Sequence, residues 1–203
     1  MCCIICRQGE TLWTSSSSSQ VFFGFAPLDD VVMGGASSST FDGNTGMWTG
    51  TVTDANSGGF VGIRSTPFRD GLSLDMSDCN GVELRLRKGD KRRYKFVVRD
   101  STEFNGICWT TPFDAVENKG GGLSDIRELF EQSRKSTNGI LIRIPFEKQI
   151  PTVFANTVPG KTFDDENVVG FQLAYSKFEY DGQLNNNFQL GDFALQVLEL
   201  KSY

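Results

Sequence analysis

The 203-residue chain contains no histidine. Histidine is the side chain that most often serves as a general base near neutral pH, and it is the commonest metal ligand. Without it, the serine–histidine and cysteine–histidine pairs of many hydrolases cannot form within one copy of the chain. Zinc sites that need imidazole are excluded too. We therefore expect no catalytic residues, no resident metal and no cofactor.

Long apolar runs and a regular cysteine framework are also missing. No hydrophobic stretch has the length needed to span a bilayer. The five cysteines are an odd number, and three of them lie among the first six residues, which does not fit a disulfide scaffold. Residues 1–20 also contain a run of five serines, and we expect a flexible Cys/Ser-rich tail there. This tail shows no targeting peptide, and cysteine palmitoylation is an alternative use for it.

The charge is low overall but uneven. A net charge of −5 argues against DNA binding. The stretch 85–99 is strongly basic, and a hairpin through Gly89-Asp90 would place its cations on one outer face. These cations are Arg85, Arg87, Arg93, Lys95 and Arg99. A solvated face is the simplest interpretation. The functional one is a docking face for an acidic protein surface or anionic lipid headgroups, and RNA is disfavoured because no exposed aromatic residues are interleaved.

Alternating apolar and polar residues dominate from residue 21 onward. The segments 82–87, 94–99 and 140–144 alternate strictly, which predicts strands with one buried and one wet face. Further strand-like runs and frequent Gly and Asp turns predict one all-β sandwich domain over 21–203. The 17 phenylalanines suit its core. One short helix, capped by Ser124, is predicted within an apparent insertion at about 114–138.

Two glycine-rich segments, 29–39 and 56–65, combine carboxylate or amide side chains with paired glycines. Asp29 and Asp30 are adjacent, so an extended chain points them in opposite directions and they do not suit a catalytic pair. We expect one of them to accept hydrogen bonds from the turn at 33–35, with partner contact or metal ligation as alternatives. Arg64 is predicted to pair with one of these aspartates, with ligand recognition as its alternative role.

These segments, Asp30 with 33–37 and then 59–65, resemble the signature of the NADH:ubiquinone oxidoreductase (complex I) intermediate-associated protein family. Further similar pieces follow in order at 81–84, 89–90, 94–95, 144–146, 188–190 and 193–200. The resemblance implies a galactose-binding-like jelly-roll β-sandwich. It also implies a non-enzymatic assembly or accessory factor that binds protein subunits of a membrane electron-transfer complex, either respiratory complex I or a photosystem.

The same resemblance implies an organellar protein, mitochondrial or plastid, that is soluble or peripheral to the inner or thylakoid membrane. We predict that it contacts its partner through Asp29, Asp30, Met33, Gly34, Gly35, Ser37, Gly59, Phe60 and Arg64, aided by the basic face. The alternative function is a carbohydrate-binding module that stacks sugars on Trp48, Trp109 or Tyr175. Core packing is the simpler interpretation of both tryptophans.

Overall fold

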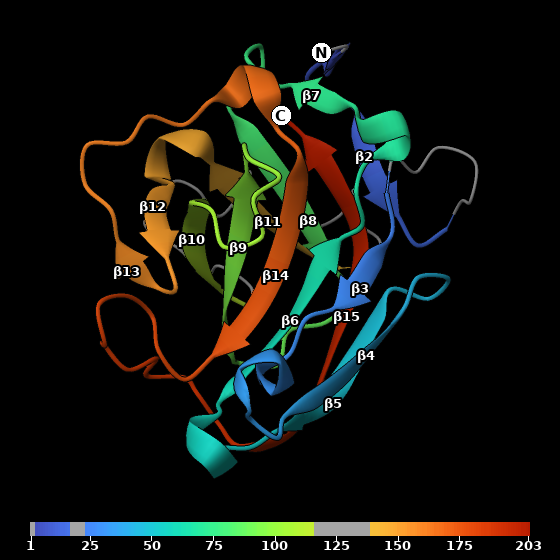
Figure 1. Cartoon of the computed structure of the whole chain (residues 1–203). Helices are drawn as coiled ribbons and strands as arrows, with labels where there is room; N and C mark the ends of the chain where they lie inside the picture. The colour runs from blue at the N-terminus through green and yellow to red at the C-terminus, as the bar shows by residue number, and fades with distance from the viewer. Residues whose placement is uncertain (1–2, 17–22, 116–138) are drawn as a thin grey trace, which may run out of the picture.

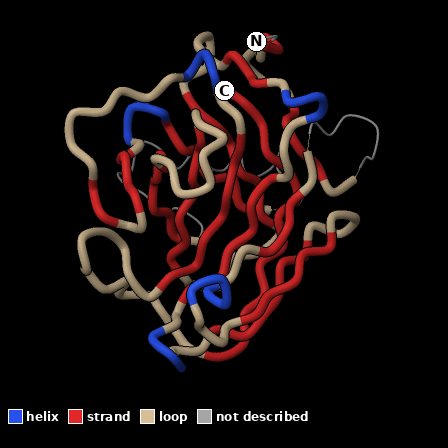
Figure 2. The backbone as a smooth tube through the Cα atoms, viewed as in Figure 1, coloured by secondary structure: helices blue, strands red, loops and turns tan. Residues whose placement is uncertain are grey.

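The computed structural model describes residues 3–16, 23–115 and 139–203 (Figure 1). Antiparallel strands stack in two layers, and Figure 1 shows β14, β9 and β6 lying in front of β15 and β8. Figure 2 shows that the described helical turns are short and lie around the ends of the strands. The predicted all-β sandwich is confirmed.

One layer is a seven-stranded antiparallel sheet. Its strands, in spatial order, are β13 (Asn156–Thr157), β12 (Ile150–Val153), β10 (Cys108–Asp114), β9 (Arg93–Arg99), β14 (Gly170–Ser176), β6 (Phe60–Ser65) and β3 (Phe25–Pro27). The register between its central strands pairs Gln172 with Arg64 on one side and with Val97 on the other. Because paired residues point to the same face, this row of side chains lies on one surface of the sheet.

The other layer is a six-stranded sheet completed by the long last strand. Its members are β11 (Ile140–Pro145), β8 (Gly81–Leu86), β15 (Gly191–Ser202), β5 (Met47–Val52) and β4 (Ser38–Asp42), with β2 (Thr11–Thr14) paired to β15. The first half of β15 pairs with β5 and its second half with β2 and β8. A small parallel pair joins β1 (Cys3–Ile5) to β7 (Ser73–Asp75).

The space between the layers is filled with aromatic and branched side chains. Trp48, Tyr94, Phe96, Phe171 and Tyr175 are all fully buried. Their rings meet at tilted or edge angles, as between Tyr94 and Tyr175, whose centroids lie 5.1 Å apart. Such offset geometries add to the stabilisation from burial alone. The many phenylalanines therefore serve the core, as the composition predicts.

The described helical turns are all 3-10 turns: η1 (Asp30–Met33), η2 (Ala55–Ser57), η3 (Arg69–Gly71), η4 (Phe146–Lys148) and η5 (Asp165–Asn167). The helix that the sequence predicts around Ser124 falls at 116–138, outside the described residues. The boundary predicted for that insertion, near residue 114, coincides with the end of β10.

The expectation of a flexible tail over 1–20 does not hold for its described part, residues 3–16. Leu12 and Trp13 are buried in β2 against β15, and Cys6 is buried too. Trp13 also packs edge-on against Phe25, with the ring centroids 5.5 Å apart. Two large apolar side chains on a four-residue strand give enough buried surface to hold this segment on the sandwich.

The predicted hairpin between the basic strands is wrong, because β8 and β9 belong to different sheets. Arg85 lies in β8 of the six-stranded sheet and Arg87 follows directly after it. The other three cations, Arg93, Lys95 and Arg99, lie in β9 of the seven-stranded sheet. Lys95 and Arg99 are moreover buried. The five cations therefore do not form one continuous face.

Candidate functional site

The carboxylate of Asp30 organises the two glycine-rich segments. It accepts hydrogen bonds from the backbone N–H of Ser37 (2.8 Å) and the Ser37 hydroxyl (2.7 Å) within its own segment. It also accepts from the N–H groups of Gly59 (2.8 Å) and Phe60 (3.2 Å) in the second segment. Burial opposes ionisation of Asp30, but these hydrogen bonds outweigh it and hold its pKa below 3.8. The two segments are thus fastened together by one buried charge.

Asp29 repeats this arrangement on the opposite side of the chain. Its carboxylate accepts from the N–H (2.6 Å) and hydroxyl (2.7 Å) of Ser39, and from the N–H of Gly62 at 3.3 Å. The predicted structural role of these aspartates is therefore correct in kind. Their donors are serines and the second glycine segment, however, and not the turn at 33–35.

Two glycines allow the chain to close around Asp30. A Cβ atom on Gly35 would lie 2.3 Å from the Asp30 carboxyl carbon, and one on Gly58 would lie 2.5 Å from a carboxylate oxygen. Both contacts are far shorter than van der Waals distances, so any side chain there would displace the carboxylate. Gly34 ends η1 with φ of +90°, a conformation that favours glycine.

Above this buried carboxylate, η1 exposes three large apolar side chains in succession. Val31, Val32 and Met33 are 57%, 59% and 66% exposed, whereas Asp30 beneath them is 2% exposed. Four hydrogen bonds to Asp30 and the Gly35 N–H bond to the Asp30 carbonyl (3.0 Å) hold this turn in place. We call Val31, Val32 and Met33 the η1 knuckle.

Two residues of the η1 knuckle, Val32 and Met33, line a groove of about 650 Å³ on the outer face of the seven-stranded sheet. Its rim also carries Phe104, Phe154 and Phe178, which are 62%, 67% and 41% exposed. Its floor contains the polar residues Arg64, Lys95, Gln172 and Thr110 beside the apolar Val97 and Ala174. The cations and amide groups on this floor distinguish the groove from the apolar core on the other side of the sheet.

Arg64 lies in the groove and does not pair with either aspartate. Its Nε donates to the Gln172 side-chain oxygen at 3.0 Å, and its guanidinium carbon lies 5.0 Å from the centroid of the Phe104 ring. Burial and, secondarily, the charge of Arg99 lower the pKa of Arg64. Within residues 3–16, 23–115 and 139–203, no carboxylate forms an ion pair with it. The predicted Asp–Arg bridge is therefore wrong.

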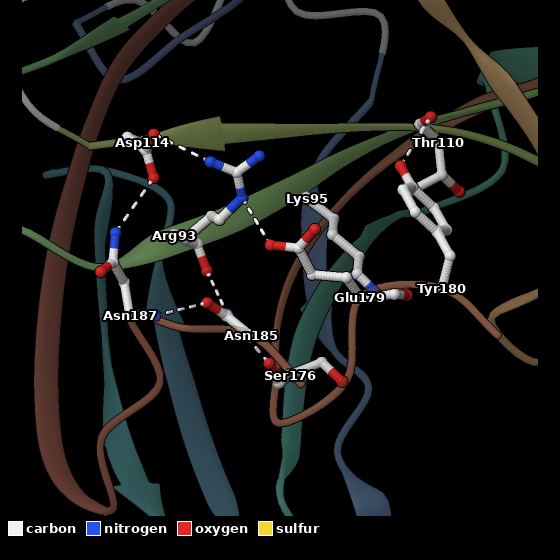
Figure 3. A network of polar contacts seen from close by, with 9 residues as sticks. All are labelled: Arg93, Lys95, Thr110, Asp114, Ser176, Glu179, Tyr180, Asn185 and Asn187. Atoms are coloured by element: carbon white, nitrogen blue, oxygen red, sulfur yellow. Dashed lines mark hydrogen bonds and ion pairs between the residues drawn. The ribbon is translucent and has the colours of Figure 1, made fainter. Parts of the chain in front are cut away.

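One wall of the groove is the loop between β14 and β15, pinned to β9 (Figure 3). Figure 3 shows Arg93 between Asp114 (2.9 Å) and Glu179 (2.6 Å), and Asn185 donating to the Arg93 carbonyl (2.9 Å). These contacts fix the loop that carries Phe178. Two of the predicted basic residues thus have supporting roles, because Arg93 holds the loop and Lys95 binds it from below.

The Lys95 ammonium donates to the backbone carbonyl of Glu179 and lies 5.4 Å from the Tyr180 ring centroid. Tyr180 in turn donates its hydroxyl to the Thr110 carbonyl at 3.1 Å. Burial lowers the pKa of Lys95 from 10.5 to about 8, although Glu179 partly opposes this. Lys95 therefore still carries its charge at neutral pH.

The sugar-stacking alternative has no platform in this structure. Trp48 and Tyr175 are fully buried, and Trp109 is 4% exposed, with its indole N–H donating to Asp100 at 2.6 Å. Rings in these positions cannot stack on a ligand. In the part of the chain that the structure describes, no group of three or more Cys, Asp or Glu side chains could hold a metal ion.

The sequence analysis missed the aromatic rim. Its three phenylalanines lie in loops that are far apart in the sequence: Phe104, Phe154 and Phe178. They come close together because these loops follow strands β9, β12 and β14, which lie near one another in the sheet order β12-β10-β9-β14. The one local signal is that each is a large apolar residue outside an alternating run. Phe154 also takes a φ of +48°, a backbone conformation that places a non-glycine residue at a tight hairpin tip.

Comparison with known families decides the relationship. The family model of Complex I intermediate-associated protein 30 (CIA30) matches residues 14–197. The chain belongs to the CIA30 family. The match begins at Thr14, the last residue of β2. No curated protein gives a significant match.

Membership of the CIA30 family implies a role in mitochondrial complex I assembly through binding to complex I subunits, and such assembly factors are non-enzymatic. The resemblance noted from the signature residues is thereby confirmed. Among the described residues, no helix combines the length and the apolar character needed to cross a membrane.

Proposed function

We propose that this CIA30-family chain holds a subunit of a complex I assembly intermediate in the groove of the seven-stranded sheet, with the η1 knuckle as its main contact. The family relationship supports a complex I subunit as the partner, and the groove in the seven-stranded sheet supports this surface as the binding site. A photosystem partner in a plastid remains the alternative that the sequence resemblance carries.

The η1 knuckle is the observation that carries this proposal. Three adjacent large apolar side chains are more than half exposed, yet the turn beneath them is held by a buried carboxylate. Contiguous exposed apolar surface at the rim of a groove is typical of a protein-binding site. A rigid turn also loses little conformational entropy when a partner docks, which favours binding.

This geometry divides the predicted site residues into two roles. Met33 and Arg64 face the groove and are proposed to contact the partner. Asp29 and Ser37 are buried and have hydrogen-bond partners within the chain, so we propose that they support the contact surface without reaching the partner.

Site-specific photo-crosslinking tests the proposal. A photoreactive phenylalanine analogue replaces Met33, and the full chain is added to solubilised mitochondrial membranes that contain complex I intermediates. The matched control places the same analogue at Leu141, which is 43% exposed on β11 of the other sheet. We expect a complex I subunit to be crosslinked from position 33 and not from position 141. Equal crosslinking from both positions, or none from position 33, would refute the assigned surface.

A further inference from the structure

We infer that the groove recognises an acidic–apolar segment of its partner, in which an Asp or Glu carboxylate binds the Arg64 guanidinium while neighbouring bulky side chains pack on the rim. This inference rests on the proposed function and adds the chemistry of the bound segment. Neither the family relationship nor the η1 knuckle specifies that chemistry.

The first step is the free hydrogen-bonding capacity of Arg64. Its Nε donates a hydrogen bond to the Gln172 side-chain oxygen, and the Phe104 ring lies against the guanidinium. The two terminal nitrogens donate no hydrogen bond to any residue that the structure describes. A guanidinium presents its donors as a fork that matches the two oxygens of a carboxylate. The terminal nitrogens of Arg64 are therefore available to bind an anionic partner.

The second step is the local excess of positive charge. Arg64, Lys95 and Arg99 lie on the same face of the sheet, and among the described residues each of them donates its hydrogen bonds to neutral oxygens. Arg99, for instance, donates to the backbone carbonyls of Ser101 and Phe104. The Glu179 carboxylate is engaged by Arg93. In a chain of net charge −5, the described lining of this groove therefore contains two cations, Arg64 and Lys95, and one carboxylate, Asp30, whose oxygens already accept hydrogen bonds within the chain.

The third step is the position of the charge relative to the apolar side chains. The cations lie on the floor, and Met33, Phe104, Phe154 and Phe178 stand around them on the rim. A membrane-binding surface has the reverse order, with apolar side chains at the tip and cations level with the headgroups. A flat bilayer would meet the rim before its phosphates reached Arg64. A protruding chain segment can enter the groove and satisfy both.

A small anion would neutralise Arg64 but leave the aromatic rim uncovered. A purely apolar segment would cover the rim and bury the cations without a partner, which is costly. Only a ligand with both properties satisfies the whole groove, and a peptide with a carboxylate flanked by aliphatic or aromatic residues has them.

The test uses the full-length chain and an array of 15-residue peptides that tile the complex I subunits. The strongest retained peptide is then measured by fluorescence anisotropy against wild type, Arg64→Gln and the control Lys161→Gln, which removes one positive charge from an exposed position outside the groove. The peptide is also made with its Asp or Glu replaced by the matching amide. We expect Arg64→Gln to weaken binding about tenfold, or about 1.4 kcal/mol, and Lys161→Gln to leave it unchanged.

The double-mutant cycle gives the decisive readout. If the carboxylate binds Arg64, the amide peptide should bind wild type and Arg64→Gln equally weakly. Independent, additive losses would overturn the inference, as would retained peptides without acidic residues or an array without retained peptides. If vesicles containing about 30% phosphatidylserine compete the peptide off the chain, the groove binds lipid and the inference is also overturned. Concentration-dependent self-association through the groove would do the same.

The two levels of proposal fail separately. Photo-crosslinking from position 33 without any dependence on Arg64 would leave the docking surface standing and remove the acidic–apolar segment. Failure of the crosslink together with a positive cycle would keep the groove chemistry and reject the η1 knuckle as the main contact. Thermal melting of Arg64→Gln, compared with wild type, ensures that a binding loss does not reflect unfolding.

Discussion

Replacing Asp30 by Asn tests whether one carboxylate holds the two glycine-rich segments together. The substitution keeps the shape of the side chain but exchanges one acceptor oxygen for a donor NH₂ group. In its best orientation, the amide oxygen would still face Gly59 and Phe60, which bond the same carboxylate oxygen. The NH₂ group would then face the Ser37 N–H, which now bonds the other oxygen at 2.8 Å.

The expected cost follows from these contacts. An unsatisfied buried N–H costs about 1–3 kcal/mol, and the remaining bonds lose the strengthening that comes from a charged acceptor. We expect Asp30→Asn to lower the free energy of unfolding by about 3 kcal/mol. For a domain of this size, that corresponds to a fall in melting temperature of about 6–12 °C.

Urea denaturation and calorimetry of the purified chain measure both quantities. The control is Asp54→Asn, which removes the same charge from an exposed carboxylate 3.9 Å from Lys177. A weak surface pair of this kind should contribute less than about 0.5 kcal/mol. If Asp30→Asn and Asp54→Asn had equal effects, the carboxylate would not be the fastening point and the reasoning would be wrong.

The pH dependence gives an independent check. The folded-state pKa of Asp30 is lowered, so its stabilising effect is complete above the unfolded value of about 3.8 and is lost as pH falls through the folded value. The difference between wild type and Asp30→Asn should therefore be constant from about pH 5 to pH 7 and shrink below about pH 3.8. A difference that grew on acidification would contradict this assignment.

Three further predictions follow from the described geometry. Gly35→Ala should lower the free energy of unfolding by more than about 2 kcal/mol, because its Cβ would lie 2.3 Å from the carboxyl carbon of the aspartate, whereas Gly43→Ala meets nothing within 4 Å and should be tolerated in the same denaturation assay. Burial raises the pKa of the Cys6 thiol to about 12, so iodoacetamide at pH 8 should modify exposed Cys3 well before Cys6, and equal rates by mass spectrometry would contradict this. The lowered pKa of Lys95, about 8, means that the unfolded state binds more protons between pH 8 and pH 10.5, so stability to urea should gain a component that rises with pH over that window and is absent in Lys95→Met.

Alternation along the chain was sufficient to place the strands at 82–87, 94–99 and 140–144, because each has a face against the core, but it did not reveal β2 within the predicted tail. Val82, Leu84 and Leu86 are all buried, as are Tyr94, Phe96 and Val98 in β9. The pattern does not say which sheet a strand joins, since both layers point the same kind of side chain inward. The basic hairpin was predicted wrongly for this reason: the connection after Gly89 crosses from one layer to the other, where Asp90 accepts hydrogen bonds from Arg92 and Tyr94.

The hydrogen bonds that join segments 29–39 and 56–65 could not be predicted from the side-chain types alone. Charge complementarity suggested that Arg64 would bind an aspartate, but the three donors to Asp30 and Asp29 from the second segment are all backbone N–H groups. Backbone donors leave no residue type to recognise. The only trace in the sequence is the glycines beside them, which mark where the chain must approach closely.

The same geometry explains why aspartates, glycines and apolar residues occur together in so short a segment. The three apolar side chains of this turn are exposed, so they contribute little burial energy to its folded conformation. Other contacts must therefore stabilise the turn. The Asp30 carboxylate does this through contacts to two segments, and Gly35 and Gly58 leave the room that the carboxylate needs. The η1 knuckle can then remain apolar and ordered before any partner arrives. This segment buries polar residues and exposes apolar ones, which is the reverse of the usual arrangement. The proposed role of the turn as a contact surface accounts for that reversal.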